Sequence, residues 1–426
     1  MKRPVWAWLA LLSSLAIAPS TAATRPHYGG SLTVELSSAW TTPTESSALS
    51  VPIIETLVRL NTRGGVDPGL CVAWQHDADF KRWRFSLRPK ITFHDGEPLN
   101  GASAAPSLLA ALKKKYGDVS IQTGGQAIVI QSSEAMPDLL SDLASPRSAV
   151  VRQSATNPLI GTGPFRVTAW EPGRRLVVAA FEDYWNGRPY LDSVAIDFGA
   201  GHERADILDV PVGPARRILP EGIATWSSAP RTLVAITGGN AQLLQPIAAA
   251  VDRAPIVNVL AQRKGEAAFS LLPQWLTGYA FLFQSTPDLA RAKQIVSQSH
   301  LGPVSLSYPP NDAFLRSVAE RIALNARDAG ITIQPTSASG TLRLTEIPLQ
   351  STDAATELAR IAATLGADHI DSSKPEALYQ AERSLLDRVI PLVHLRETYG
   401  IAPRVHIESS NSDSFSLHLE DIWVQH

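Results

Sequence analysis

The sequence predicts a mixed α/β protein with at least two lobes. Its 426 residues are more than one compact domain usually contains. Apolar residues make up 44% of the chain and occur along its whole length, so a buried core is expected rather than disorder. Strand-like segments alternate with amphipathic helical segments, and the strand–helix–strand run of residues 304–334 is typical of a parallel sheet.

The first residues predict a cleaved secretory signal over residues 1–22. Lys2 and Arg3 precede the apolar stretch 5–18, which is followed by small residues. This stretch is shorter than the about 20 residues that span a bilayer as a helix, although an uncleaved anchor is the alternative. Residues 15–25 contain no cysteine that could receive a lipid. We therefore expect a periplasmic protein that is not a lipoprotein.

Alternation and turn residues predict the strands of the first half. Residues 31–36 alternate polar and apolar side chains, and Asp95-Gly96 marks a tight turn. Apolar residues at helical spacing predict a helix over 104–115, whereas 53–60 is either helical or extended. Further strands are expected at 83–87, 91–93, 127–131, 165–170, 176–181 and 194–198.

Longer helical segments predominate in the second half. Apolar residues at helical spacing predict helices over 242–262, 289–299, 314–329 and 376–389. Strands are expected at 304–308, 331–334 and 392–397.

Charge and motif content argue against nucleic-acid binding and offer no support for catalysis. Lys plus Arg total 38 and Asp plus Glu total 40, whereas nucleic-acid binders usually carry a basic excess. HExxH, GxSxG and phosphate-loop motifs are absent, and the histidines lack metal-ligand spacing. The single cysteine, Cys71, excludes an internal disulfide. We predict no enzyme, no cofactor and no metal site, with a secreted hydrolase as a minor alternative.

Two motifs carry a specific resemblance. The first is RWRFSLRPKITFHDGEPL at residues 82–99. The second is GTGPF at 161–165, followed by Trp170, Gly173 and YWNGRP at 184–189. Weaker similarities follow the same order at 137–143, 248–257 and 319–331. Together these segments resemble the bacterial extracellular solute-binding proteins of family 5, which are the dipeptide, oligopeptide and nickel-binding receptors of ABC importers.

The resemblance implies a two-lobed periplasmic-binding-protein-like fold (type II) with an extra subdomain on the first lobe. The ligand of such a protein lies between the lobes and is trapped when they close about a hinge. We expect the hinge crossings near residues 237–240 and 398–400. The expected first lobe comprises 27–48, 160–238 and 398–426, the inserted subdomain 49–159, and the second lobe 239–397.

The motif residues are expected to have structural roles rather than to contact a ligand. His94 is suited to hydrogen bonding within its turn, with ligand contact as the alternative. Gly161 and Gly163 allow close backbone passage. Tyr184 and Trp185 are expected to anchor a loop onto the sheet rather than to touch a solute.

Position and chemistry suggest five ligand-binding residues. Trp40 lies in the loop after the first strand, which faces the cleft in the family, and aromatic walls are common in solute pockets; a core position is the alternative. Arg343 is suited to a bidentate pair with a ligand carboxylate, or else lies on the surface. The other candidates are Trp226, Trp275 and Tyr308. The stretch 337–369 lacks the acidic loop that holds the peptide amine in peptide-binding members, so peptide binding is not favoured.

These inferences predict a periplasmic solute-binding receptor of an ABC importer that captures a small-molecule or peptide solute. Its expected partner is an ABC permease in the inner membrane, and the expected state is a monomer that binds no nucleic acid. The short second lobe and the missing amine anchor leave an alternative, which is a degenerate family member acting as a sensory or scaffold protein without transport.

Overall fold

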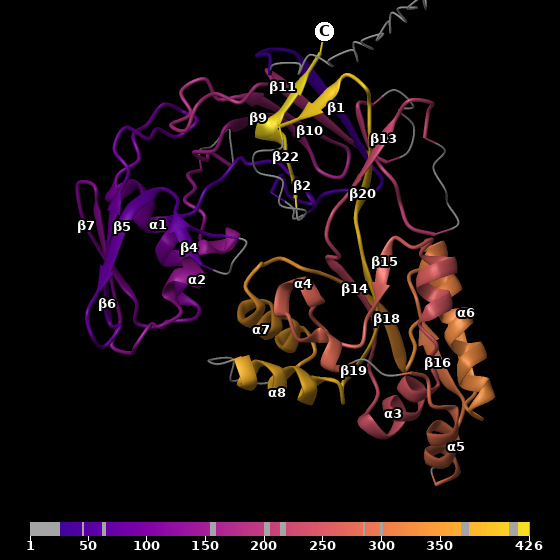
Figure 1. The fold of residues 1–426 in the computed structure, drawn as a ribbon. Helices are drawn as coiled ribbons and strands as arrows, with labels where there is room; N and C mark the ends of the chain where they lie inside the picture. The colour runs from indigo at the N-terminus through magenta and orange to yellow at the C-terminus, as the bar shows by residue number, and fades with distance from the viewer. Residues whose placement is uncertain are drawn as a thin grey trace, which may run out of the picture.

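The computed structural model describes residues 26–44, 47–61, 65–153, 159–199, 205–213, 219–283, 286–298, 301–367, 375–408 and 416–425. The predicted signal segment 1–22 lies outside these residues. Figure 1 shows one large sheet above another, with a smaller sheet to their left. The mixed α/β prediction is confirmed. None of the helices in the described ranges is long and apolar enough to cross a membrane.

The upper sheet has seven strands among the described residues. Their spatial order is β13 (Ala224–Ser227), β20 (Thr398–Ile401), β12 (Ile207–Asp209), β1 (Ser31–Leu36), β11 (Ser193–Phe198), β10 (Arg175–Ala180) and β9 (Phe165–Glu171). β1 pairs in parallel with both β11 and β12. Leu32 and Val34 alternate with exposed residues and are buried in the first core, as the pattern of 31–36 predicts.

The lower sheet has six strands in the described part of the chain. Their order is β15 (Gly265–Ala267), β19 (Val389–Leu395), β14 (Thr232–Thr237), β18 (Leu342–Pro348), β16 (Val304–Ser307) and β17 (Ile333–Thr336). One face is covered by α3 (Ala241–Ala250), α5 (Leu289–Ser297) and α6 (Ala313–Asp328). The other face is covered by α4 (Gln274–Thr277), α7 (Ala354–Thr364) and α8 (Pro375–Leu385).

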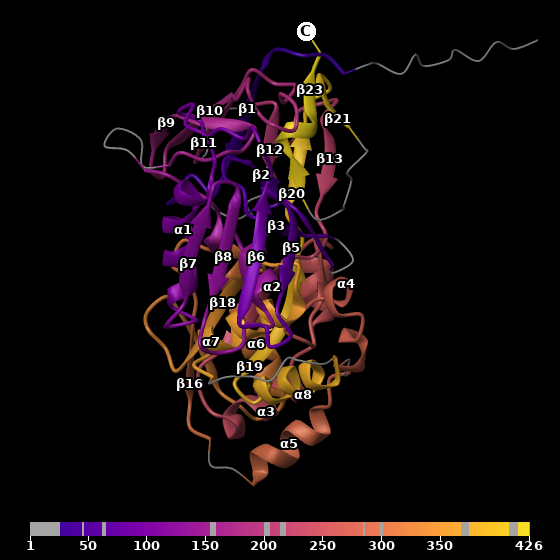
Figure 2. The ribbon, with the colours of Figure 1, turned by 90° about the vertical axis from the view of Figure 1, so that its left-hand side faces the viewer.

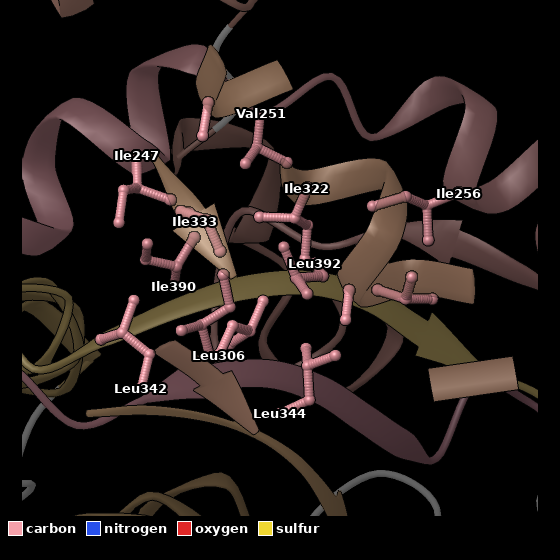
Figure 3. Close-up of a cluster of buried hydrophobic side chains, with 14 of the residues drawn as sticks. Ile247, Val251, Ile256, Leu306, Ile322, Ile333, Leu342, Leu344, Ile390 and Leu392 are labelled. Atoms are coloured by element: carbon pink, nitrogen blue, oxygen red, sulfur yellow. The ribbon is translucent and has the colours of Figure 1, made fainter. Parts of the chain in front are cut away.

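Both faces of this sheet are buried, which explains its apolar strands. Ile236 of β14 points into the core of the α3–α6 face, whereas Leu233 and Ala235 point into the opposite core. Figure 3 shows Leu306 and Leu392 of the sheet beside Ile322 of α6 in the core of the α3–α6 face. The predicted strand–helix–strand unit is present, since β16 and β17 pair in parallel on either side of α6.

The smaller sheet, facing the viewer in Figure 2, orders β5 (Cys71–His76), β6 (Arg82–Leu87), β8 (Ala127–Gln131) and β7 (Ser120–Gly124). It packs with α1 (Gly101–Lys113) and α2 (Leu139–Ala144) around a separate core that includes Trp83 and Phe85.

The remaining short elements of the described chain are β2 (Leu49–Ser50), β3 (Val58–Leu60), β4 (Val66–Pro68), β21 (Val405–Ile407), β22 (Leu417–His418), β23 (Ile422–Val424), η1 (Pro146–Ser148), η3 (Ala280–Phe283) and η5 (Leu419–Asp421).

The GTGPF glycines pass close to another backbone segment, as predicted. A Cβ added at Gly161 would lie 2.0 Å from the carbonyl oxygen of Ile53, and one at Gly163 would lie 2.3 Å from that of Pro52. His94 bonds outside its own turn, because its Nε2 contacts the carbonyl oxygen of Gly163 at 2.9 Å. This contact corrects the expected bond within the turn.

Glu55 joins the second motif to the smaller sheet. Its carboxylate accepts hydrogen bonds from the hydroxyls of Thr162 (2.8 Å) and Tyr184 (3.0 Å) and from Nε1 of Trp185. Burial raises the pKa of Glu55 and these donors oppose that rise. Tyr184 and Trp185 therefore anchor their own loop to Glu55.

The long helix predicted over 242–262 is interrupted. α3 ends at Ala250, and a separate π-helical turn, η2 (Ile256–Leu260), follows. The break occurs where Arg253 turns into the core, and its Nε donates to backbone carbonyls of two neighbouring segments at 2.8 and 2.9 Å. Pro255 lies in the same break and has no amide hydrogen to continue the helical bonding, so the helix is interrupted there.

The described chain crosses between the two large sheets at 228–231 and at 396–397. β13 ends at Ser227 in the upper sheet, and β14 begins at Thr232 in the lower sheet. β19 spans 389–395, which corrects the predicted strand 392–397, and β20 begins at Thr398. β14 therefore belongs to the lower sheet, although the predicted first lobe ran to residue 238.

Candidate functional site

A cavity of about 500 Å³ lies between the two large sheets, close to both crossings. Its walls come from the loop after β1, the segment after β12, the start of β20, the N-terminus of α6 and the adjacent ends of β14, β18 and β19. Small-molecule sites usually occupy roughly 300–1,000 Å³. The cavity is therefore large enough for a small solute and is shared by both sheets.

Trp40 forms an apolar wall of the cavity. Its side chain is 4% exposed and packs against Phe198, with ring centroids 5.5 Å apart. The carbonyl oxygen of Trp40 accepts a hydrogen bond from the backbone nitrogen of Gly173 at 2.9 Å, which fixes the loop. Trp40 thus belongs to the first core and also lines the cavity.

Asp209 holds the loop that carries Trp40. The Ser37 backbone nitrogen donates to Asp209 Oδ2 at 2.7 Å, and the Ser37 hydroxyl donates to Oδ1 at 2.9 Å. Both residues line the cavity. The end of β12 and the loop after β1 are therefore joined at the cavity wall by charge-assisted hydrogen bonds.

The lower sheet contributes an acidic and aromatic wall. Asp312 is the N-cap of α6, and its Oδ1 accepts a hydrogen bond from the Leu315 backbone nitrogen at 2.8 Å. Phe314 adds an apolar surface, and Glu346 of β18 lies on the same wall.

Glu346 is the carboxyl group whose pKa is most informative. Its side chain is accessible because it faces the cavity, yet the cavity walls displace much of the surrounding water. This burial, with a smaller contribution from the charge of Asp312, raises the pKa of Glu346 to about 7. Its charge therefore changes near neutral pH.

Glu397 ties the two crossings together at the base of the cavity. Its Oε1 lies 3.2 Å from Nε of Arg231, whose side chain is 3% exposed. Its Oε2 accepts hydrogen bonds from the Tyr399 hydroxyl and from the Ala48 backbone nitrogen, both at 2.8 Å. Burial and the neighbouring Glu397 carboxylate raise the pKa of Tyr399, so its hydroxyl stays protonated as a donor.

The charged groups of the cavity lining are mostly acidic. Asp209, Asp312, Glu346 and Glu397 line it beside one guanidinium group, that of Arg396. This composition favours a ligand with a positively charged group. In the described part of the chain, no three or more His, Cys, Asp or Glu side chains are grouped so that they could hold a metal ion.

Of the five predicted site residues, Trp40 lines this cavity and the other four do not. Trp226 of β13 packs against Tyr399, with ring centroids 6.0 Å apart. Trp275 of α4 is 39% exposed, and its Nε1 donates to the Pro230 carbonyl oxygen at 2.7 Å. Tyr308 is partly buried against the core of the α3–α6 face, and Arg343 is exposed on β18. A ligand-binding role for these residues stays a prediction.

The acidic wall was not predicted as a site. The residues before α6 carry a visible N-cap signal in Asp312, but the signal indicates a helix start and not a cavity. Glu346 sits on a strand whose alternation indicates only which side is buried. Asp209 and Glu397 come from distant segments that meet only because β12 and β20 pair.

Comparison with known proteins shows a family resemblance over part of the chain. Residues 65–206 match the family model described as bacterial extracellular solute-binding proteins, family 5 Middle. The nickel-binding protein NikA of Staphylococcus aureus is 28% identical over 184 residues, covering 38% of this chain and 37% of NikA. The dipeptide-binding protein of Escherichia coli is 24% identical over 368 residues, covering 68% of this chain and 67% of that protein. The matches to the nickel-binding relatives thus span about a third of their length.

Solved structures share the fold over nearly the whole chain. NikA of Brucella suis, in complex with Fe(III)-EDTA, has a TM-score of 0.75 at 18% identity and covers 93% of this chain and 100% of its own. The oligopeptide-binding protein AppA of Bacillus subtilis, in complex with a nonapeptide, has a TM-score of 0.72 at 14% identity, covering 94% and 100%. The predicted two-lobed type II fold with an extra subdomain is confirmed. Over residues 65–206 the chain therefore resembles the bacterial extracellular solute-binding proteins, family 5.

Proposed function

We propose that the protein is a periplasmic solute-binding receptor of an ABC importer, which captures a small solute between its lobes by hinge closure. The observation that carries this proposal is the cavity of about 500 Å³, whose walls come from both large sheets beside the two crossings. Such a site changes shape when the lobes move, so solute binding and lobe position are coupled.

The division into lobes follows from the crossings. We assign the hinge to 228–231 and 396–397, which moves the predicted end of the first lobe from residue 238 to about 230. The inserted subdomain, predicted as 49–159, is assigned a start at about residue 55, because Leu49 and Ile53 pack in the core of the upper sheet and β2 pairs with β22. Secretion through a cleaved signal, a lipid-free periplasmic form, a monomeric state and delivery to an inner-membrane permease belong to the same proposal.

The cavity favours a solute that combines a positively charged group with an apolar part. The carboxyl group of Glu346 faces the cavity, while Trp40 and Phe314 supply apolar walls. Two relatives are named as a dipeptide-binding protein and a nickel-binding protein, and NikA of Brucella suis is in complex with Fe(III)-EDTA. An amine-bearing solute fits the acidic wall without requiring metal ligands from the protein.

The alternative is a degenerate member that acts as a sensory or scaffold protein without transport. Such a protein has no need for an open cavity, and its cleft is expected to be filled by side chains. The open cavity with an aromatic wall therefore favours the receptor.

A thermal-shift screen of the purified chain tests the proposal. The panel is Ni(L-His)2, Fe(III)-EDTA, agropinic acid, the dipeptide Ala-Phe, whose only cation is its amino terminus, and its N-acetylated form. A true solute at 100 times its Kd stabilises the folded state by about 2.7 kcal/mol. We expect the free dipeptide to raise Tm more than the acetylated one. No shift with any compound at millimolar concentration argues against a receptor for these classes, and a stronger shift with the acetylated dipeptide refutes the preference for a cation.

A further inference from the structure

The segment 210–213, which we call the strap, leaves the upper sheet and packs on the lower one. It follows β12, and the Val210 nitrogen still donates to the Thr398 carbonyl oxygen at 2.8 Å. Val212 then packs against the core of the lower sheet. Three of these residues, Val210 to Val212, also line the cavity. The strap therefore contacts the lower sheet although the strands before and after it, β12 and β13, both belong to the upper sheet.

Gly213 shows how closely the strap fits α6. Its φ is +105°, and a Cβ added there would lie 2.7 Å from Cβ of Phe314. A residue with a side chain would be strained in this conformation and would push the strap away from the start of α6.

Side chains from the turn between η2 and β15 hold the strap. Lys264 Nζ donates to the carbonyl oxygens of Val210 and Pro211 at 3.2 and 3.1 Å. Gln262 Nε2 donates to the Gly213 carbonyl oxygen at 3.2 Å. Three of the strap's four carbonyls are thus bound by donors from the lower sheet's side.

The turn that supplies these donors has an unfavourable backbone. Gln262 and Arg263 are consecutive non-glycine residues with φ of 52° and 63°. Left-handed conformations of this kind persist only where the surrounding contacts fix them. The Arg396 nitrogen donates to the Lys264 carbonyl oxygen at 2.9 Å, so the turn is also fixed to a crossing segment.

We propose that the strap and its clamp, Lys264 with Gln262, are a third connection between the lobes that holds the cavity wall and limits lobe opening before any solute binds. The two crossings lie side by side, since β13 pairs with β20 and β14 with β19. A paired ribbon of this kind can bend and twist. The strap adds contacts at the start of α6 and at Lys264, beside the crossing at 396–397, and this third point of attachment restricts both motions. Lys264 is a positioning residue here.

Double electron–electron resonance on the full chain tests this directly. Spin labels at Ala169→Cys in β9 and Leu324→Cys in α6 report the separation of the two sheets, and both positions are exposed. Burial raises the pKa of the native Cys71 thiol to about 11, which keeps it unreactive toward the label. The protein is unfolded and refolded to remove any carried solute before it is labelled, so that Cys71 is buried again when the label is added.

Lys264→Met is expected to broaden the distance distribution toward longer separations, whereas the exposed Lys293→Met is expected to leave it unchanged. Gln262→Gly, which relieves the backbone strain, provides a second variant should Lys264→Met fail to refold. A Lys264→Met or Gln262→Gly distribution that superimposes on that of the parent overturns the proposal, as does equal broadening by Lys293→Met. Because no solute is added, this outcome is independent of whether the protein binds any compound of the panel.

Discussion

Replacing Glu397 by alanine is expected to destabilise the junction of the lobes severely. The carboxylate faces the buried guanidinium of Arg231 at 3.2 Å and accepts hydrogen bonds from Tyr399 and Ala48, each at 2.8 Å. Removing one partner of a buried ion pair costs about 3–5 kcal/mol, because the remaining charge stays desolvated. The two donors left without their acceptor cost about 1–3 kcal/mol each in isolation, but contacts of one network do not add.

The total for Glu397→Ala is therefore taken as about 3–5 kcal/mol. At about 2 °C per kcal/mol for a large chain, Tm falls by about 6–10 °C, which differential scanning calorimetry measures. The matched control is Glu171→Ala, which breaks an ion pair with Arg174 whose side chains are 52% and 81% exposed and is worth less than about 1 kcal/mol.

A second change separates the buried charge from the other lost contacts. Adding Arg231→Met to Glu397→Ala removes the desolvated guanidinium and is expected to recover part of the lost Tm. The reasoning is refuted if Glu397→Ala lowers Tm no more than Glu171→Ala does, or if the added Arg231→Met lowers Tm further.

Three further predictions concern the motif and the cavity. Gly163→Ala places a Cβ 2.3 Å from the Pro52 carbonyl oxygen and is expected to lower the unfolding free energy, measured in urea, by about 1–3 kcal/mol. The control, Gly117→Ala, has open space around the added Cβ and is expected to change it by no more than about 0.5 kcal/mol. Equal effects of the two substitutions contradict the close passage. Burial raises the folded-state pKa of Glu346 to about 7, so its contribution to stability is complete below pH 4.5 and is lost as pH rises through 7. The Tm of the parent relative to Glu346→Gln should therefore fall between pH 4.5 and 8, and a constant difference contradicts this pKa. Trp40→Ala should lower the unfolding free energy by about 3–5 kcal/mol, and a loss below about 1 kcal/mol contradicts its place in the core.

The sequence was most informative where local pattern and burial coincide. The alternation of residues 31–36 predicted β1, and the helical spacing of 314–329 predicted α6 almost to the residue. The close passage of Gly161 was also predicted, because only a residue without a side chain fits there. The two motifs that carry the family resemblance lie in the same close backbone passage and its hydrogen bonds.

Features that depend on tertiary contacts were missed. The short strand β12 carries too few residues for any periodicity. The helix break, by contrast, has a local signal in Pro255, which the prediction of one helix over 242–262 did not take into account. The crossing at 228–231 was placed too late because the apolar run of β14 shows no alternation once both its faces are buried. The carboxyl groups of the cavity were missed because pairing of remote strands assembles them.

The central claim is that a small solute binds in the cavity between the lobes. The most direct test repeats the thermal-shift titration with Ser38→Trp, which places an indole in the cavity from an exposed lining position, and with Ser133→Trp, a matched exposed serine on the smaller sheet's side. We predict that the compound that raises Tm of the parent also raises that of Ser133→Trp and leaves that of Ser38→Trp unchanged. An equal rise in Ser38→Trp contradicts the site, and no rise in the parent with any compound contradicts the claim that this cavity captures the tested solutes.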